Sequence, residues 1–233
     1  MAEQFDFERH WLTKLAASLE EHVGEAACQE IMAGSDALSD QSDRQKVISW
    51  SQQAIDRLEA LVDEHTRQQI MLGCACQYGK ADLQQAKEYY QTTADLDGAH
   101  RMLQDQFELF LRQGLKVDET TIAEVVARGW GLAGIRQGST IVATKIPKSG
   151  YLVQYMQADD PEQRRQFYCH CPRIRDALKT RVDISPTYCY CGGGFYKGIW
   201  QEILGEPVQV ELLSSVLAGD DTCSFAIRLP IDP

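Results

Sequence analysis

The spacing of apolar residues changes near Gly114, and this change limits the folds that the chain can adopt. Before Gly114, apolar residues recur every three or four positions, which predicts helices over residues 11–23, 47–61, 82–92 and 97–113. After Gly114, apolar and polar residues alternate in short segments, which predicts strands over residues 139–146, 151–156, 208–212 and 222–229. Helices followed by strands predict an α+β fold, with a helical region at residues 1–113 and an α+β ligand- or metal-binding domain at residues 114–233. We expect helices of the second region to pack on an antiparallel sheet.

Turn and cap signals divide the second region further. The segment 147–150 predicts a hairpin loop between the first two strands, and Asp160-Pro161 predicts the start of a helix that carries Phe167. The glycines Gly192-Gly-Gly194 precede a predicted helix over residues 195–204.

The charge of the chain excludes some partners. Among 233 residues the net charge is −11, and a nucleic-acid backbone or an anionic membrane requires a basic surface. The N-terminal residues are acidic and polar, and no apolar run approaches the roughly 18 residues of a membrane span. We therefore expect a cytoplasmic protein without direct nucleic-acid or membrane binding, while a homodimer stays open. In that reducing compartment its eight cysteines would be metal ligands, reactive thiols or buried apolar groups.

Six of the cysteines form three pairs with the same spacing: Cys74-Ala-Cys76, Cys169-His-Cys171 and Cys189-Tyr-Cys191. A random arrangement of eight cysteines over this length gives about 0.2 such pairs, so the spacing requires a cause. In extended chain the two sulfurs of a pair lie on one face and can converge on a metal ion, but their Cα atoms are at the limit of disulfide geometry. In a helix the same spacing turns the thiols apart.

The neighbouring residues favour the extended conformation. Pro172 follows Cys171 and interrupts a helix there, while three glycines follow Cys191. Cys191 is then expected just ahead of a helix N-terminus, which favours a thiolate. This makes Cys191 the candidate catalytic nucleophile.

Three interpretations of the cysteines stay open. The first is a site for a soft metal, zinc or an iron–sulfur centre, with ligands drawn from Cys169, Cys171, Cys189, Cys191 and Cys223. The second is a thiol-redox or nucleophilic site at Cys191. The third is a set of buried thiols that act as small apolar groups, which is our expectation for the isolated Cys28.

The C-terminal residues 189–211 and 218–227 resemble two related families. These are the vinyl-reductase-type (4-vinyl reductase) ligand-binding domains and the aminothiazoline carboxylic acid hydrolase-like proteins. The shared features are a Cys before a glycine-containing helix, the turn Leu204-Gly-Glu-Pro-Val208, and the motif Gly219-Asp-Asp-Thr-Cys-Ser-Phe225. The segments 61–67 and 169–172 also resemble uncharacterised proteins of anaerobes near the hydrolase family.

The resemblance implies a ligand-binding function. The sensor domains bind small hydrophobic molecules, and some hold zinc on a Cys before the helix, a Glu-x-x-Cys after the strand, and the final Cys. In this chain the first ligand would be Cys189 or Cys191 and the last Cys223, but Leu212 and Ser215 stand at the middle positions and cannot bind zinc. We expect Cys169 and Cys171 to replace them.

From these observations we expect a small-molecule or metal-binding protein with a thiolate site. The alternatives are a hydrolase that opens a small C–N or C–S bond and a structural or interaction module.

Overall fold

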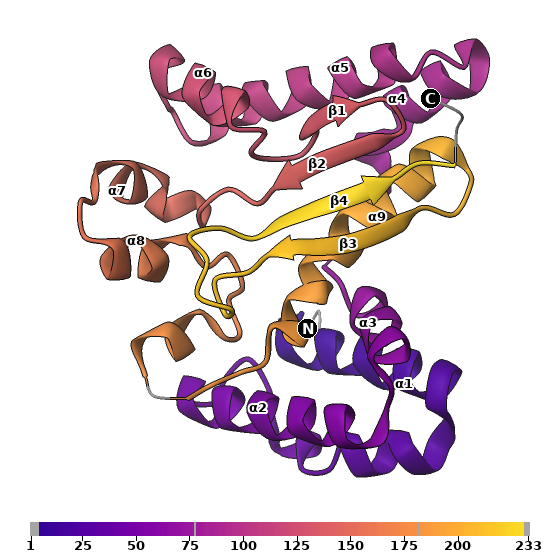
Figure 1. Cartoon of the computed structure of the whole chain (residues 1–233), viewed down its shortest axis with the longest axis vertical. Helices are drawn as coiled ribbons and strands as arrows, with labels where there is room; N and C mark the ends of the chain where they lie inside the picture. Colours follow the sequence, from indigo (N-terminus) through magenta and orange to yellow (C-terminus); the bar gives the residue numbers. More distant parts are fainter. Residues whose placement is uncertain (1–4, 77, 181, 231–233) are drawn as a thin grey trace. The chain divides into compact units, whose positions relative to one another are not determined.

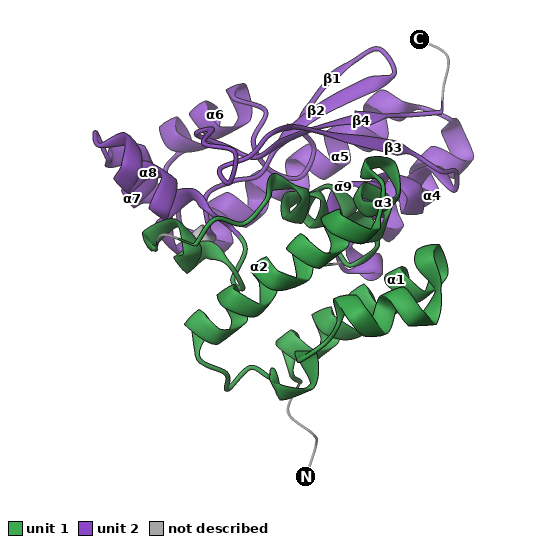
Figure 2. Ribbon diagram, turned by 60° about the horizontal axis from the view of Figure 1, so that its bottom comes forward, with its two compact units in different colours: residues 1–76, 171–194 green, residues 77–170, 195–233 purple. Residues whose placement is uncertain are grey.

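A computed structural model describes residues 5–76, 78–180 and 182–230 and confirms the α+β class. The chain forms two compact units (Figure 2): unit 1 is residues 1–76 with 171–194, and unit 2 is residues 77–170 with 195–233. This division differs from the predicted boundary between residues 113 and 114. Two of the predicted helices, over residues 82–92 and 97–113, fall in the unit that contains the sheet. Across the described part of the chain, none of the helices combines the length and apolar character that a membrane span requires.

Unit 1 is helical. Its regular elements are α1 (Phe7–Ile31), α2 (Arg44–Leu61), α3 (Glu64–Gly73), the 3₁₀ helices Ser35–Ala37, Arg175–Lys179 and Pro186–Cys189, and the first turn of α9 (Tyr190–Leu204). Asp6, Asp43 and Asp63 cap the first three helices by accepting backbone N–H groups of the first turn. The predicted helices over residues 11–23 and 47–61 are confirmed, although Leu61 of the second stripe is 47% exposed. Most of their apolar side chains are buried: Leu12, Leu15, Leu19, Val47, Ile48, Ile55 and Leu58.

Unit 2 contains the sheet. Its elements are α4 (Lys80–Thr93), α5 (Leu96–Leu109) with a π-helical extension Phe110–Gly114, α6 (Glu119–Ala127), β1 (Ile135–Gln137), β2 (Thr140–Thr144), the 3₁₀ helix Ser149–Tyr151, α7 (Leu152–Gln157), α8 (Pro161–Tyr168), the rest of α9, β3 (Gln209–Ser214) and β4 (Ser224–Arg228). The strand order is β1-β2-β4-β3, and each neighbouring pair is antiparallel. Helices α4, α5 and α9 lie on one side of this sheet (Figures 1 and 2).

The alternation in the strands explains the core of unit 2. Ile141 pairs with Ile227 and Ala143 with Phe225, and all four side chains are buried on one face. Tyr196 of α9 packs against Phe225 with 5.5 Å between ring centroids. The predictions of strands over residues 139–146, 208–212 and 222–229 are therefore confirmed as β2, β3 and β4.

The predicted strand over residues 151–156 is wrong. The segment is a 3₁₀ turn followed by helix α7, so residues 147–150 are not a hairpin loop. Leu152 and Tyr155 are buried whereas Val153 is 50% exposed, which is the burial of a helix and not of a strand. The helix predicted after Asp160 is confirmed as α8, with the Asp160 carboxylate accepting the backbone N–H of Gln163.

Candidate thiol site

The cysteines of the three pairs are distributed over both units. Cys74, Cys76, Cys171, Cys189 and Cys191 belong to unit 1, while Cys169 and Cys223 belong to unit 2. The five predicted metal ligands are thus divided, with Cys171, Cys189 and Cys191 in unit 1. That Cys223 and Cys169 share a site with them stays a prediction.

The pair Cys189-Tyr-Cys191 is not extended, and that prediction is wrong. Cys189 ends a 3₁₀ helix, and Cys191 lies in the first turn of α9, which begins at Tyr190 and not at residue 195. The glycines after Cys191 therefore form helix instead of a free loop. Cys169 and Cys171, by contrast, lie outside regular helix, as Pro172 led us to expect.

Cys191 meets Cys74 and Trp11 in the interior of unit 1. The Trp11 indole Nε1–H donates to the Cys191 sulfur at 3.3 Å, and the Cys191 thiol lies 3.8 Å from the carbonyl oxygen of Cys74. The Cys191 thiol thus lies beside the end of α3 that carries Cys74. Cys74 is fully buried and donates to the carbonyl oxygen of Met71 at 3.1 Å, whereas Cys191 is partly exposed. We call Cys74 and Cys191 the dithiol.

Close packing of two helix ends creates the dithiol. Cys74 is the C-cap of α3, and Gly194 of α9 lies against that end: a Cβ on Gly194 would be 2.0 Å from the Leu72 oxygen and 2.7 Å from the Ala75 Cβ. Only glycine permits this approach of the two backbones. The Lys14 ammonium also donates to the carbonyl oxygen of Ala75 at 2.9 Å.

The segment before Cys189 is fixed by one carboxylate. Ser185 and Thr187 both donate their hydroxyl groups to Glu59 Oε1 of α2, each at 2.6 Å. Burial alone would raise the pKa of Glu59, but these two hydrogen bonds and the charge of Arg67 hold it below its ordinary value. An ionised Glu59 therefore ties the chain that leads into α9 to α2.

The charge of Cys191 affects the ionisation of Cys171. Burial of the thiol and negative charge on Cys191 raise the pKa of Cys171 to about 11. Burial, followed by the hydrogen bond and charge of Cys191, raises the pKa of Cys74 well above its ordinary value. Cys74 and Cys171 are consequently neutral thiols at neutral pH.

A buried ion pair lies beside these thiols. The Arg173 guanidinium donates to Glu8 Oε1 through Nε at 2.8 Å and again through one terminal nitrogen, and to the Tyr188 hydroxyl at 2.7 Å. Its carbon Cζ lies 3.6 Å from the centroid of the Trp11 ring, which stacks on Tyr188. Burial alone would lower the pKa of Arg173, but Tyr188 and Glu8 raise it, so Arg173 stays charged. This frame orients Trp11, the hydrogen-bond donor to Cys191.

The sequence alone did not reveal this frame, and the role of Cys74 stayed open. A signal for Glu8 was present, because Glu8 precedes Trp11, Leu12 and Leu15 by three, four and seven residues and so lies on their buried stripe. A carboxylate on such a stripe indicates a buried cation. Which cation it pairs with, Arg173, is set by tertiary structure, since 165 residues separate the two.

The thiols do not form a complete metal site. Over residues 5–76, 78–180 and 182–230, no three His, Cys, Asp or Glu side chains are grouped so that they could hold a metal ion. The dithiol supplies two sulfur donors, and a closed tetrahedral zinc site requires four ligands. The arrangement instead offers two thiols to a soft ligand, with one thiol partly exposed.

In unit 2 the remaining cysteines take part in packing. The Tyr168 hydroxyl accepts the backbone N–H of Cys223 at 2.8 Å and donates to the carbonyl oxygen of Lys145 at 2.5 Å. The Cys223 sulfur accepts the backbone N–H of Val216 at 3.5 Å, and Cys169 is buried. Cys223 is partly exposed and immediately precedes β4.

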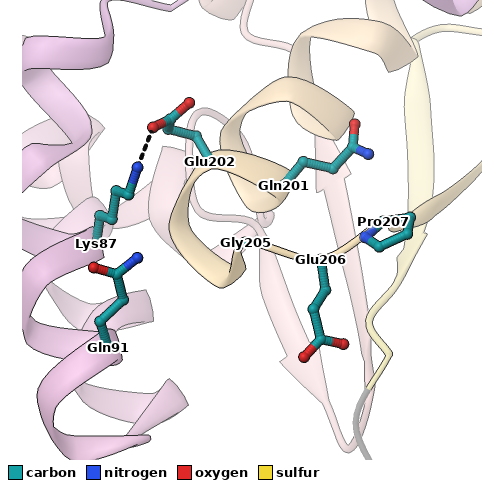
Figure 3. Close-up of a pocket in the computed structure, with 7 residues that line it drawn as sticks. All are labelled: Lys87, Gln91, Gln201, Glu202, Gly205, Glu206 and Pro207. Carbon is teal, nitrogen blue, oxygen red and sulfur yellow. Dashed lines mark hydrogen bonds and ion pairs between the residues drawn. The ribbon is translucent and has the colours of Figure 1, made fainter.

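Unit 2 also has a polar depression of 410 Å³ beside α4 and the C-terminal end of α9 (Figure 3). Its lining consists of Lys87, Gln91, Gln201, Glu202, Gly205, Glu206 and Pro207. Lys87 pairs with Glu202 at 2.6 Å, and hydrogen bonds from Lys87 and Lys80 lower the pKa of Glu202. The lining residues provide neither a thiol nor an imidazole.

Comparison with known proteins identifies one similarity. Residues 152–232 match the model of a family of unknown function (DUF6144). Neither a curated protein nor a solved structure shows significant similarity to the chain. The matched region contains Cys171 and Cys191, whereas Cys74 and Trp11 lie outside it.

Proposed function

We propose that this protein binds a small thiophilic ligand, a soft metal ion or a small molecule with a thiol-reactive centre, through the dithiol of Cys74 and Cys191. The observation that carries the proposal is the contact of the Cys191 thiol with the carbonyl oxygen of Cys74 at 3.8 Å, which brings together two cysteines 117 residues apart in the chain. Free thiols keep this ability only in a reducing compartment, so we place the protein in the cytoplasm.

The surroundings of the dithiol support a sequence of binding steps. Cys191 is partly exposed and accepts the Trp11 N–H, which stabilises a thiolate and makes Cys191 the first point of contact. Cys74 is buried and neutral, so it binds second and must lose its proton to the solvent.

Phenylarsine oxide tests the proposal, because its arsenic bonds to two neighbouring thiols and releases one water. We expect reduced protein to bind one molecule per chain, as measured by intact mass and by titration of the thiols that remain. Loss of either thiol leaves a single As–S bond, and the loss of the second, intramolecular contact weakens binding by about 100-fold or more. Cys191→Ser and Cys74→Ser should therefore lose tight binding.

Cys28→Ser is the matched control, because Cys28 is another buried thiol of unit 1 whose sulfur bonds a carbonyl oxygen of its own helix. It should bind like the unmodified chain. Tight binding that survives Cys191→Ser would contradict the proposal. A parallel titration with Cd²⁺, followed by sulfur-to-cadmium absorption, tests the metal form of the ligand and the contribution of Cys171.

A further inference from the structure

We infer that Cys74 and Cys191 form a reversible disulfide that closes the ligand site when the protein meets a low-molecular-weight disulfide. This inference rests on the proposed dithiol site and adds its regulation. The observations behind it are the approach of the two backbones, the contact of the Cys191 thiol with the Cys74 carbonyl oxygen, and the unequal exposure of the two thiols.

The backbone geometry brings the two cysteines together. A disulfide requires Cα atoms within about 7 Å and sulfurs that face each other. Cys74 and Cys191 lie at the two helix ends that Gly194 brings into backbone contact, with 2.0 Å between a Cβ built on Gly194 and the Leu72 oxygen. The Cys191 sulfur already lies 3.8 Å from the Cys74 carbonyl oxygen, so closing the bond requires loss of two hydrogen atoms and rotation of the two side chains.

Unequal exposure sets the order of the exchange. The Cys191 thiolate, stabilised by the Trp11 N–H, attacks one sulfur of the small disulfide; a Cys191–S bond forms, the S–S bond breaks, and the leaving thiolate takes a proton. Cys74 then loses its proton and attacks the Cys191 sulfur, which releases the second small thiol. Two protein thiols are oxidised and one small disulfide is reduced to two thiols. Excess small thiol reverses both steps.

Cys74 is the resolving thiol because of its position. It is fully buried, so a small disulfide reaches it only through Cys191. Cys171 is the competing thiol, and it lies two residues before Arg173, outside the two helix ends that Gly194 brings together. Mapping the linked cysteines separates these two candidates.

The test uses the full chain, fully reduced and then incubated with oxidised glutathione. Free thiols are blocked with N-ethylmaleimide, and the linked peptides are identified by mass spectrometry after proteolysis. We expect a Cys74–Cys191 linkage with little retained glutathione, and complete reversal by excess reduced glutathione. In Cys74→Ser, glutathione should stay on Cys191; in Cys191→Ser neither product should form, and Cys28→Ser should behave like the unmodified chain.

Linkage mapping of the unmodified chain decides the matter even where a variant does not fold. Retained glutathione on Cys191 without a linkage, or a linkage of Cys191 to Cys171, would overturn the inference. The same samples are titrated with phenylarsine oxide, which the oxidised protein should not bind. Tight arsenical binding to reduced protein without any disulfide would overturn this inference but leave the proposed function standing. If the protein neither bound the arsenical nor formed the disulfide, the proposed function would be rejected as well.

Discussion

Gly194 of α9 lies so close to the end of α3 that a Cβ atom there would come within 2.0 Å of the Leu72 carbonyl oxygen. Gly194→Ala should therefore separate the two helix ends and destabilise the protein by about 1–3 kcal/mol, as overpacking does. It should also weaken arsenical binding, since the thiols move apart. The control is Gly198→Ala in the same helix, where nothing lies within 4 Å and alanine should stabilise by about 0.5–1 kcal/mol. Urea unfolding measures both, and equal effects of the two substitutions would contradict the assigned role of Gly194.

Both side chains of the ion pair between Arg173 and Glu8 are buried, with exposed fractions of 1% and 0%. Arg173→Met should cost about 3–5 kcal/mol in unfolding free energy, because it leaves the Glu8 carboxylate buried without its main partner. The double variant Glu8→Gln, Arg173→Met should lose less than the sum of the single variants. Additive losses in urea unfolding would show that the pair does not act as a unit. The exposed pair Arg228–Glu211 is the control, and its loss should cost at most about 1 kcal/mol.

The hydrogen bonds to Glu59 predict a pH dependence of stability. Because the folded protein lowers the pKa of Glu59, its ionised form contributes stability above the ordinary glutamate pKa, and this contribution is lost as the pH falls through the lowered value. Glu59→Gln should be less stable than the unmodified chain at pH 7, and the difference should shrink below about pH 4. Urea unfolding over this pH range tests the sign. Glu30→Gln, at an exposed position, should leave the curve unchanged.

The raised pKa of Cys171 predicts slow alkylation. With a pKa of about 11, the Cys171 thiolate at pH 8 is about 100-fold less populated than that of a cysteine with the ordinary pKa. Quantitative mass spectrometry after iodoacetamide treatment should show Cys171 modified far more slowly than the exposed Cys76. In denaturant the two rates should become equal. A similar rate for both cysteines in the folded protein would contradict the effect of burial.

The hydrogen bond from Trp11 predicts the reactivity of Cys191. Trp11→Phe removes the N–H donor while keeping a ring to stack on Tyr188, so the Cys191 thiolate loses about 1.4 kcal/mol of stabilisation and alkylation slows about tenfold. Trp50→Phe is matched, because the Trp50 indole donates to the carbonyl oxygen of Ala33 instead. It should leave the alkylation rate of Cys191 unchanged. Equal rates in both variants would show that the Trp11 N–H does not support the thiolate.

Local sequence determined most of the elements. Helical stripes, Asp caps and alternating apolar residues depend on near neighbours, and they predicted α1, α2, α8, β2 and β4. The same local reasoning failed at residues 151–156, since Leu152 and Tyr155 are buried by distant parts of unit 2 that the segment itself does not specify. It failed again at Cys191. In the sequence the three glycines after Cys191 look like a loop, but they belong to the first turn of α9, where Gly194 packs closely on the end of α3.

The site depended on tertiary structure for a related reason. The repeated Cys-x-Cys spacing drew attention to the right residues, but it suggested that the two members of each pair act together. In unit 1 the contact joins one member of one pair, Cys74, to one member of another, Cys191. Spacing along the chain fixes only the directions of neighbouring side chains. The packing of two helix ends decides which cysteines lie close together. Here a single glycine, Gly194, sets the distance between those ends.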